Sequence, residues 1–219
     1  ELSLITAPSI NNISDLAGKS IALDALTTGF AFVLFDMLES AGIARSDVEF
    51  VAVGATPQRW QSVKDGNQVA TLTIEPFTSL ALLEGFNVVA KSTDFYSEYQ
   101  GGVIATTRSL LANQPEKAKV FIEAYLKGLT WVLDPSNVDH AQTLLSSRMP
   151  QIRQRAMLAV MSSLTSPKSG LTPFAALLDK GMDQVVDLRK KYGSSSSPIA
   201  PVANFLDLSL YTDLEQSSR

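Results

Sequence analysis

The stretch from Gly18 to Gly42 constrains the fold of this chain more than any other, because it combines the patterns of a strand, a turn and a helix. Residues 20–23 form a short apolar run, and residues 24–29 form a small polar turn. Beyond the turn, apolar residues recur at the three- and four-residue spacing of a helix, namely Phe30, Val33, Leu34, Met37, Leu38 and Ala41. Gly42 stands where many helices end in a residue with positive φ. We therefore predict a strand, a turn and a helix in that order.

The turn in this stretch contains Thr27, Thr28 and Gly29. A threonine hydroxyl in this position can cap the helix by accepting a hydrogen bond from a free backbone N–H. The remaining free N–H groups and the positive end of the helix dipole also favour an anion or a ligand oxygen above the strand. Two interpretations are therefore open, a helix cap alone and a ligand-binding turn.

A second unit of the same kind begins at residues 48–53, where polar and apolar residues alternate as in a strand. Gly54 and Ala55 then lead into a helix. We expect Thr56 at the N-cap of this helix and Pro57 at its first helical position, which is where proline is favoured.

A third unit begins at residues 69–74, a short run rich in β-branched side chains that is typical of a buried strand. Glu75 and Pro76 end this run, a helix is predicted over 77–83, and another strand is predicted at 87–91. Strands that alternate with helices at this spacing predict an α/β fold with a mostly parallel sheet and crossover helices.

The three turns occupy equivalent positions, each directly after a predicted strand. Ligands of such sheets bind beyond the carboxyl ends of the strands, so the turns together predict a binding face. Glu75 is the one carboxylate at a predicted strand end, and it fits a charge partner for a helix N-terminus as well as a ligand contact. The candidate ligand-binding residues in these turns are Thr27, Thr28, Gly29, Gly54, Ala55, Thr56, Glu75 and Pro76.

The chain changes character near residue 96, where aromatic and glycine residues form a crossing into a helix-rich second half. Tyr99, Gln100 and Gly101 in this crossing complete the candidate ligand-binding set, although a place in the core is the alternative for Tyr99, as it is for Trp60. The elements predicted beyond the crossing are a strand at 103–106, helices at 115–134, 138–147, 150–164 and 172–192 (the last with Thr172 as its N-cap), and a docking segment at 205–211.

Composition excludes several classes of function. The chain has 219 residues, of which 45% are hydrophobic, and this suits one large domain or two small lobes. A net charge of −4 and the lack of a basic run argue against nucleic acid and anionic membranes as partners. The absence of cysteine excludes disulfides, thiolate catalysis and Cys-ligated metals. The single histidine, His140, fits a solvated surface position, so we expect no catalytic residue, metal site or cofactor.

Several segments between residues 15 and 135 resemble, in order and spacing, the motifs of one family. They are Asp15-Leu16-Ala17-Gly18-Lys19, Gly66 with Val69-Ala70, Glu75-Pro76-Phe77, Gly102-Val103-Ile104-Ala105-Thr106, Asn113-Gln114-Pro115-Glu116, and Trp131 with Asp134-Pro135. This pattern resembles the substrate-binding proteins of ABC importers with the type II periplasmic fold. The resemblance is to the NMT1/THI5-like group, which is related to the binders of sulfonates, taurine, nitrate and thiamine precursors. Val69 departs from the pattern, because the family has an acidic residue there.

The resemblance implies a type II periplasmic-binding-protein-like fold in three parts. The hinge strand would span 1–7, the α/β second lobe 8–101, and the return hinge with the helical part of the first lobe 102–219. Closure about hinges near Ala7 and Gly102 would bury the ligand.

The resemblance also implies a function. The protein would bind a small, anionic or heterocyclic solute between its lobes and deliver it to the membrane permease of an ABC importer. It would work in the periplasm or elsewhere outside the cytoplasm, and it would not be an enzyme. Two alternatives stay open: an enzyme on the same fold that uses Glu75 or His140, and a sensory or interaction module that no longer binds solute.

The family has an N-terminal half-lobe ahead of the hinge strand, and because residues 1–6 resemble that hinge strand, the resemblance implies that the half-lobe is missing here. The helices over 115–192 carry broad apolar faces, and only residues 1–6 and 103–106 offer strands to cover them on that side. Two strands are barely enough to cover the apolar faces of these helices. We therefore expect an exposed apolar patch, or its burial by a homodimer partner or by a missing N-terminal segment.

Overall fold

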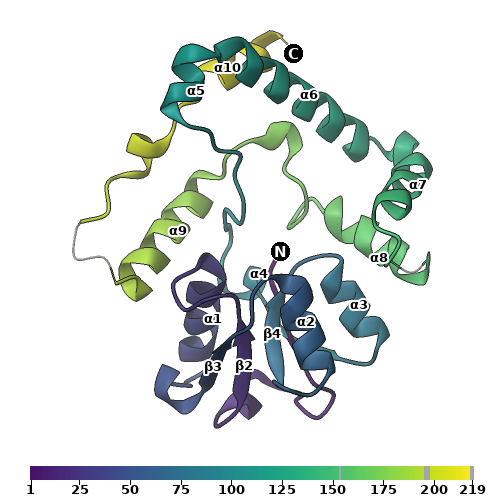
Figure 1. Ribbon diagram of the computed structural model, residues 1–219, viewed down its shortest axis with the longest axis vertical. Helices are drawn as coiled ribbons and strands as arrows, with labels where there is room; N and C mark the ends of the chain where they lie inside the picture. The colour runs from purple at the N-terminus through teal and green to yellow at the C-terminus, as the bar shows by residue number, and fades with distance from the viewer. Residues whose placement is uncertain (153, 195–197, 218–219) are drawn as a thin grey trace.

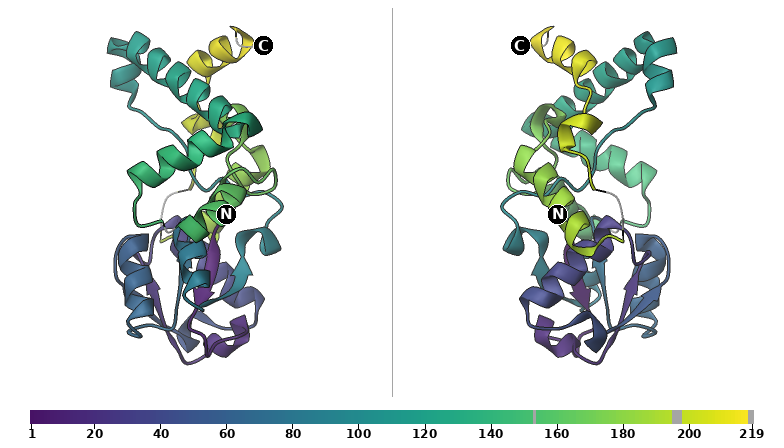
Figure 2. Two further views of the ribbon diagram at one scale, coloured as in Figure 1. Left: turned by 90° about the vertical axis from the view of Figure 1, so that its right-hand side faces the viewer. Right: turned by 90° about the vertical axis from the view of Figure 1, so that its left-hand side faces the viewer.

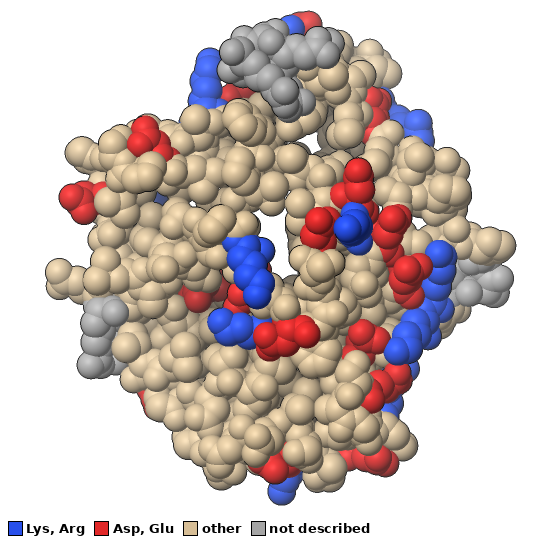
Figure 3. Space-filling model, turned by 180° about the vertical axis from the view of Figure 1, so that it is seen from behind, with Lys and Arg blue, Asp and Glu red and all other residues tan. Residues whose placement is uncertain are grey.

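The computed structural model describes residues 1–152, 154–194 and 198–217. Its first part is an α/β lobe, and its second part is an arch of helices that stands on the lobe at two places (Figures 1 and 2). Figure 3 shows that an opening remains between the arch and the lobe, with basic and acidic side chains at its rim. The predicted α/β lobe and helix-rich second part are thus confirmed.

The lobe is built on a sheet in the order β3-β2-β4-β1-β5. The strands are β1 (Ser3–Thr6), β2 (Ser20–Leu23), β3 (Glu49–Ala52), β4 (Ala70–Thr73) and β5 (Asn87–Lys91). β2 pairs in parallel with β3 and β4, whereas β1 pairs antiparallel with β4 and β5. Four strands therefore share one direction, and β1 runs against them inside the sheet.

Helices cover both faces of this sheet. They are α1 (Gly29–Ser40), α2 (Thr56–Lys64), α3 (Phe77–Leu83) and the short α4 (Ser92–Phe95), with 3₁₀ turns η1 (Ile13–Leu16) and η2 (Arg45–Asp47). Successive strand residues point to opposite faces. Accordingly, Ile21 of β2 packs in the cluster on the α1 side, and Ala22 packs with α2 and α3 on the other side. Trp60 of α2 is 6% exposed, so it is a core residue.

The described part of the arch contains no strand and is built from helices. They are α5 (Arg108–Asn113), α6 (Pro115–Leu133), α7 (Val138–Arg148), α8 (Gln154–Leu164), α9 (Asp179–Tyr192) and α10 (Ser209–Ser217), with 3₁₀ turns η3 (Pro135–Asn137), η4 (Pro173–Ala175) and η5 (Val202–Phe205). One foot of the arch is α8, where Met157 and Met161 pack in a cluster with Leu80 of α3. The other foot is α9, which lies against α1.

One predicted element of the second half is wrong, and another begins later than predicted. Residues 103–106 form no strand, because they are exposed and no strand of the described chain pairs with them. The helix that ends at Tyr192 begins at Asp179 rather than near Thr172. Phe174 and Ala175 have positive φ values of 57° and 53°, and this conformation stops a helix directly after its first turn.

No helix in the described ranges combines the length and the apolar character that crossing a membrane requires.

Candidate functional site

The carboxyl ends of β2, β3 and β4 lie side by side at one edge of the lobe, since these three strands are adjacent and parallel. The register pairs Ser3, near the start of β1, with Thr73 at the end of β4. The N-terminus therefore marks this edge, and it lies between the lobe and the arch in every view (Figures 1 and 2). The turns predicted to bind ligand thus face the opening.

Thr28, in the turn after β2, is the N-cap of α1. Its Oγ accepts a hydrogen bond from the N–H of Ala31 at 3.2 Å and donates to Asp24 Oδ1 at 2.7 Å. The helix-cap interpretation is therefore confirmed, and ligand contact by Thr28 stays a prediction. Thr27 is exposed beside it, and Gly29 is the first residue of α1.

The turn after β3 differs from the prediction. Ala55, not Thr56, is the N-cap of α2, and it makes no side-chain cap bond. The Thr56 hydroxyl is engaged elsewhere, because it accepts a hydrogen bond from Arg59 Nη2 at 3.0 Å. Gly54, with a φ of 113°, turns its carbonyl to Arg59 Nη1 at 2.7 Å.

Arg59 is a functional candidate that sequence reasoning missed. Only 2% of this residue is exposed, although arginine is almost never fully buried unless it is paired. Besides the bonds to the β3–α2 turn, its guanidinium donates to Thr71 Oγ1 at 3.1 Å and to the Leu72 carbonyl at 3.2 Å. Arg59 thus fastens the turn after β3 to β4. The sequence shows an arginine within one helical turn of Thr56. It takes the fold to show that this side chain points into the lobe.

The charge of Arg59 is not neutralised by direct contact. Among the described residues no carboxylate forms an ion pair with it, and its guanidinium lies 4.9 Å from the centre of the Phe30 ring. Burial lowers the pKa of Arg59, and the carboxylate of Asp24 opposes this shift. A buried cation next to the turns favours a negatively charged ligand on the side of the turns that faces the opening.

The turn after β4 contains Glu75 and Pro76, joined by a cis peptide bond. The Glu75 carboxylate accepts hydrogen bonds from the N–H of Ser79 at 3.4 Å and from its hydroxyl at 3.0 Å, at the start of α3. This is the geometry of a helix N-terminal partner. Burial raises the pKa of Glu75, and the bonds from Ser79 oppose the shift. Pro76 is buried at the N-cap of α3.

The crossing at residues 99–101 connects the lobe to α9. Gln100 uses its side-chain oxygen to accept a bond from the N–H of Leu178 at 2.9 Å, and its own N–H donates to the Gly181 carbonyl at 3.3 Å. Gly181 permits this approach, since a Cβ there would lie 2.8 Å from Gln100 N. Gly101 is exposed, and the Tyr99 ring stacks on Tyr96 with centroids 5.8 Å apart.

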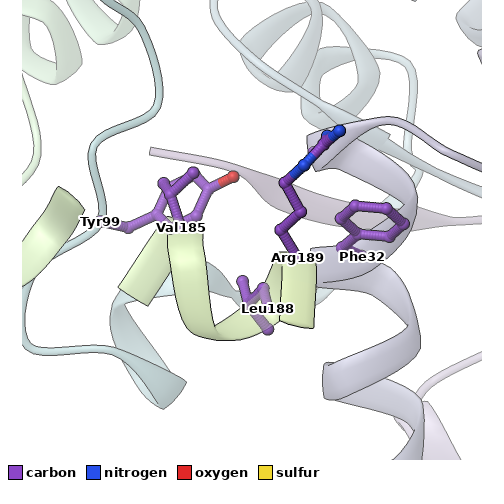
Figure 4. Close-up of a pocket in the computed structure, with 6 residues that line it drawn as sticks. Phe32, Tyr99, Val185, Leu188 and Arg189 are labelled. Carbon is purple, nitrogen blue, oxygen red and sulfur yellow. The ribbon is translucent and has the colours of Figure 1, made fainter. Parts of the chain in front are cut away.

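A pocket of about 100 Å³ lies between α1, α9 and this crossing (Figure 4). It is lined by Gly29, Phe32, Tyr99, Val185, Leu188 and Arg189. The pocket brings together two predicted residues, Gly29 and Tyr99, that are 70 positions apart in the sequence. The prediction missed its α9 wall because helical spacing alone does not tell which helix α9 packs on.

An ionic cluster fixes α9 to α1 next to this pocket. Asp36 of α1 accepts hydrogen bonds from Lys191 Nζ at 2.9 Å, from the Tyr192 hydroxyl at 2.9 Å and from the Tyr96 hydroxyl at 2.7 Å. Burial would raise the pKa of Asp36, but these hydrogen bonds outweigh it, so the pKa is lowered. The ionic cluster at Asp36 therefore fixes the position of α9, which forms one wall of the pocket.

His140, the residue left open for catalysis, is exposed on α7. In the part of the chain that the structure describes, no group of three or more His, Asp or Glu side chains is arranged to hold a metal ion.

The sequence matches the family model described as NMT1/THI5 like over residues 2–137. The chain belongs to the NMT1/THI5-like family. The match spans the lobe and α6, and it ends before α9, so Arg189 lies outside it. No curated protein matches the sequence of this NMT1/THI5-like chain at a significant level.

Solved structures with the same fold are distant in sequence. A protein from Bordetella bronchiseptica has a TM-score of 0.77 and 16% identity, over 99% of this chain and 71% of that one. The alkanesulfonate-binding protein SsuA from Xanthomonas axonopodis, bound to MOPS, has a TM-score of 0.70 and 14% identity, over 87% and 64%. The desulfurization enzyme DSZB has a TM-score of 0.65 and 12% identity, over 100% and 76%. The NMT1/THI5-like chain thus spans roughly two thirds to three quarters of the length of these structures, and at such identities the likeness shows the fold alone.

Proposed function

We propose that this protein binds a small anionic or heterocyclic solute between its lobe and its arch, and delivers it to the permease of an ABC importer outside the cytoplasm. The observation that carries the proposal is the meeting of three strand-end turns and one pocket at the same opening, with the buried charge of Arg59 behind the turns. The Xanthomonas protein of the same fold is a binding protein for alkanesulfonates.

In this proposal the candidate residues act in two groups. Residues 27–29 and 54–56 present backbone N–H groups at helix N-termini, and Thr27 adds an exposed hydroxyl, which together suit ligand oxygens. Residues 75–76 and 99–101 would flank the ligand. The lobe at 8–101 and the arch at 102–219 would close about hinges near residues 7 and 102.

The test is a thermal-shift screen of the purified chain with sulfonates, nitrate, bicarbonate and pyrimidines, followed by calorimetry on every positive. A ligand at 100 times its Kd stabilises the folded state by about 2.7 kcal/mol. For a chain of this size that corresponds to a shift of roughly 5–10 °C in Tm. Chloride at matched ionic strength is the control, because salts stabilise many proteins without binding a site. A flat response to the whole panel would contradict the proposal and favour an interaction module.

An enzyme is the second candidate, and one observation favours it. Glu75 is a partly buried carboxylate with a raised pKa at the edge of the opening, which is a feature of general acids and bases. DSZB shows that the fold also occurs in an enzyme. Turnover of a panel compound that stops in Glu75→Gln would support this candidate. Saturable binding with no turnover would support solute binding.

A further inference from the structure

We propose that the pocket between α1 and α9 holds the charged group of the solute, and that the solute is a small organic anion whose oxygens contact Arg189 and Tyr99. This inference rests on the proposed function and adds the class of ligand and the residues that select it. Arg189 would be the specificity-determining residue.

Arg189 differs from the two cations that follow it on α9. Lys190 pairs with Asp187 at 3.2 Å, and Lys191 pairs with Asp36 at 2.9 Å and with Glu39 at 3.1 Å. The Arg189 side chain has no hydrogen bond or ion pair with any described residue, and it lines the pocket instead. In Figure 4 it extends from α9 past Phe32 on α1. An unpaired guanidinium beside a pocket suits a carboxylate or sulfonate, whose oxygens can accept two parallel N–H bonds.

Tyr99 shows the same contrast among the tyrosines of this region. The hydroxyls of Tyr96 and Tyr192 both contact Asp36, whereas the Tyr99 hydroxyl contacts no described acceptor and points into the pocket (Figure 4). Burial raises the pKa of Tyr99, so the phenol stays protonated at neutral pH and can donate a hydrogen bond. Gly29 leaves room for it, since a Cβ there would lie 3.3 Å from the Tyr99 oxygen.

The remaining walls are apolar and limit the size of the ligand. Phe32 is 4% exposed and Leu188 is 3% exposed, and Val185 lies beside them. The volume of about 100 Å³ is smaller than the roughly 150 Å³ of a cavity that takes up benzene. The pocket therefore suits a charged head group with one or two carbons, and any longer tail would extend into the opening.

The experiment measures binding of methanesulfonate, ethanesulfonate, acetate and propionate by calorimetry to the full chain and to three variants. The neutral probe is dimethyl sulfone, which has the shape of methanesulfonate without its charge. Arg189→Gln should weaken binding of the anions by about 10- to 100-fold, as expected for loss of a bond between charged groups. Tyr99→Phe should weaken it by about 3- to 10-fold. Lys190→Gln is the control, because it removes the same charge from the next position of α9, and it should bind like the original chain.

The outcomes separate this inference from the proposed function. Anion binding that falls in Arg189→Gln but not in Lys190→Gln supports the inference. Equal losses in both variants would overturn it, because they would show a long-range effect of net charge. Equal binding of dimethyl sulfone and methanesulfonate would overturn it, and so would a chain that binds none of the four anions. If that chain binds a heterocycle of the wider panel, the proposed function stands and only the pocket assignment fails.

Discussion

The hydroxyl of Tyr192 lies 2.9 Å from Oδ1 of Asp36, and this contact joins residues 156 positions apart. Tyr192 also stacks on Phe32 and meets Phe35 edge-on, with ring centroids 6.3 and 5.8 Å away. The hydrogen bond between Tyr192 and Asp36, which is surrounded by aromatic rings, therefore attaches α9 of the arch to α1 of the lobe.

Asp36→Asn should destabilise the protein by about 1.5–3 kcal/mol, the usual worth of hydrogen bonds to a charged group. The amide keeps the shape of the carboxylate but loses its charge and one acceptor oxygen. Urea unfolding measures the effect. Asp187→Asn is the control, because its pair with Lys190 is exposed and should count for less than about 0.5 kcal/mol. Equal stability of the two variants would show that the Asp36 contacts do not anchor α9.

The lowered pKa of Asp36 predicts a loss of stability in acid. Its carboxylate is favoured in the folded state, so its contribution is complete above the ordinary pKa of 3.8 and is lost as the pH falls through the lower folded value. Urea midpoints measured from neutral pH down to about pH 2.5 should fall less steeply for Asp36→Asn than for the original chain. Parallel curves below pH 4 would rule this out.

Glu75 predicts the opposite trend. Because its pKa is raised in the folded state, stability should decrease as the pH rises from the ordinary value of 4.5 through the folded value. Glu75→Gln removes this titration, so its stability relative to the original chain should improve across that interval. The same urea series tests it, and a constant difference between the two proteins from pH 4 to neutral would contradict it.

Arg59→Met should destabilise the lobe by roughly 3 kcal/mol or more, because the carbonyls of Gly54 and Leu72 lose their donor inside the protein. Arg108→Met, at an exposed position, is the control and should be near neutral. Hydrogen exchange should also become faster in the β3–α2 turn of Arg59→Met. Unchanged exchange in that turn would show that Arg59 does not hold it.

Thr28→Val separates capping from ligand contact. Loss of the cap should lower stability by about 1 kcal/mol, and the exposed neighbour Thr27→Val should not lower it. If Thr28 also contacts ligand, affinity should fall by a further 1–3 kcal/mol or so. Urea unfolding measures the stability of each variant, and calorimetry measures its affinity for ligand. A loss of stability at constant affinity would restrict Thr28 to capping.

The exposed apolar surface of the arch gives a further test. Val120 is 63% exposed and Phe121 is 54% exposed on α6, and Val103 and Ile104, which follow the crossing, are 57% and 54% exposed. A purified chain with this surface should bind a hydrophobic dye or self-associate in light scattering. Val120→Ser combined with Phe121→Ser should reduce both signals. A dye-silent monomer would contradict the expectation.

Local patterns predicted the main strands and helices of the lobe. Residues 20–23 were predicted as a strand and form β2, and Thr28 was predicted as a possible cap and is one. The failures have tertiary causes. Residues 103–106 have strand-like composition but no neighbouring strand in the described chain, and a strand without a partner leaves its backbone unpaired. Arg59 and Arg189 look like any surface arginine in the sequence, and only packing turns one inward and the other towards a pocket.

The place of β1 in the sheet has a practical consequence for anyone who produces this protein. The amino group of Glu1 donates to the Ser169 carbonyl in the loop after α8, and the Glu1 carboxylate pairs with Lys91 at the end of β5. Residues fused ahead of Glu1, such as an affinity tag, would emerge at the opening and turn the charged donor to Ser169 into a neutral peptide N–H, which makes a weaker hydrogen bond. They would then occupy the space in which we propose that solute binds. A tag fused after α10, which Figure 1 shows on the far side of the arch, would leave the opening clear.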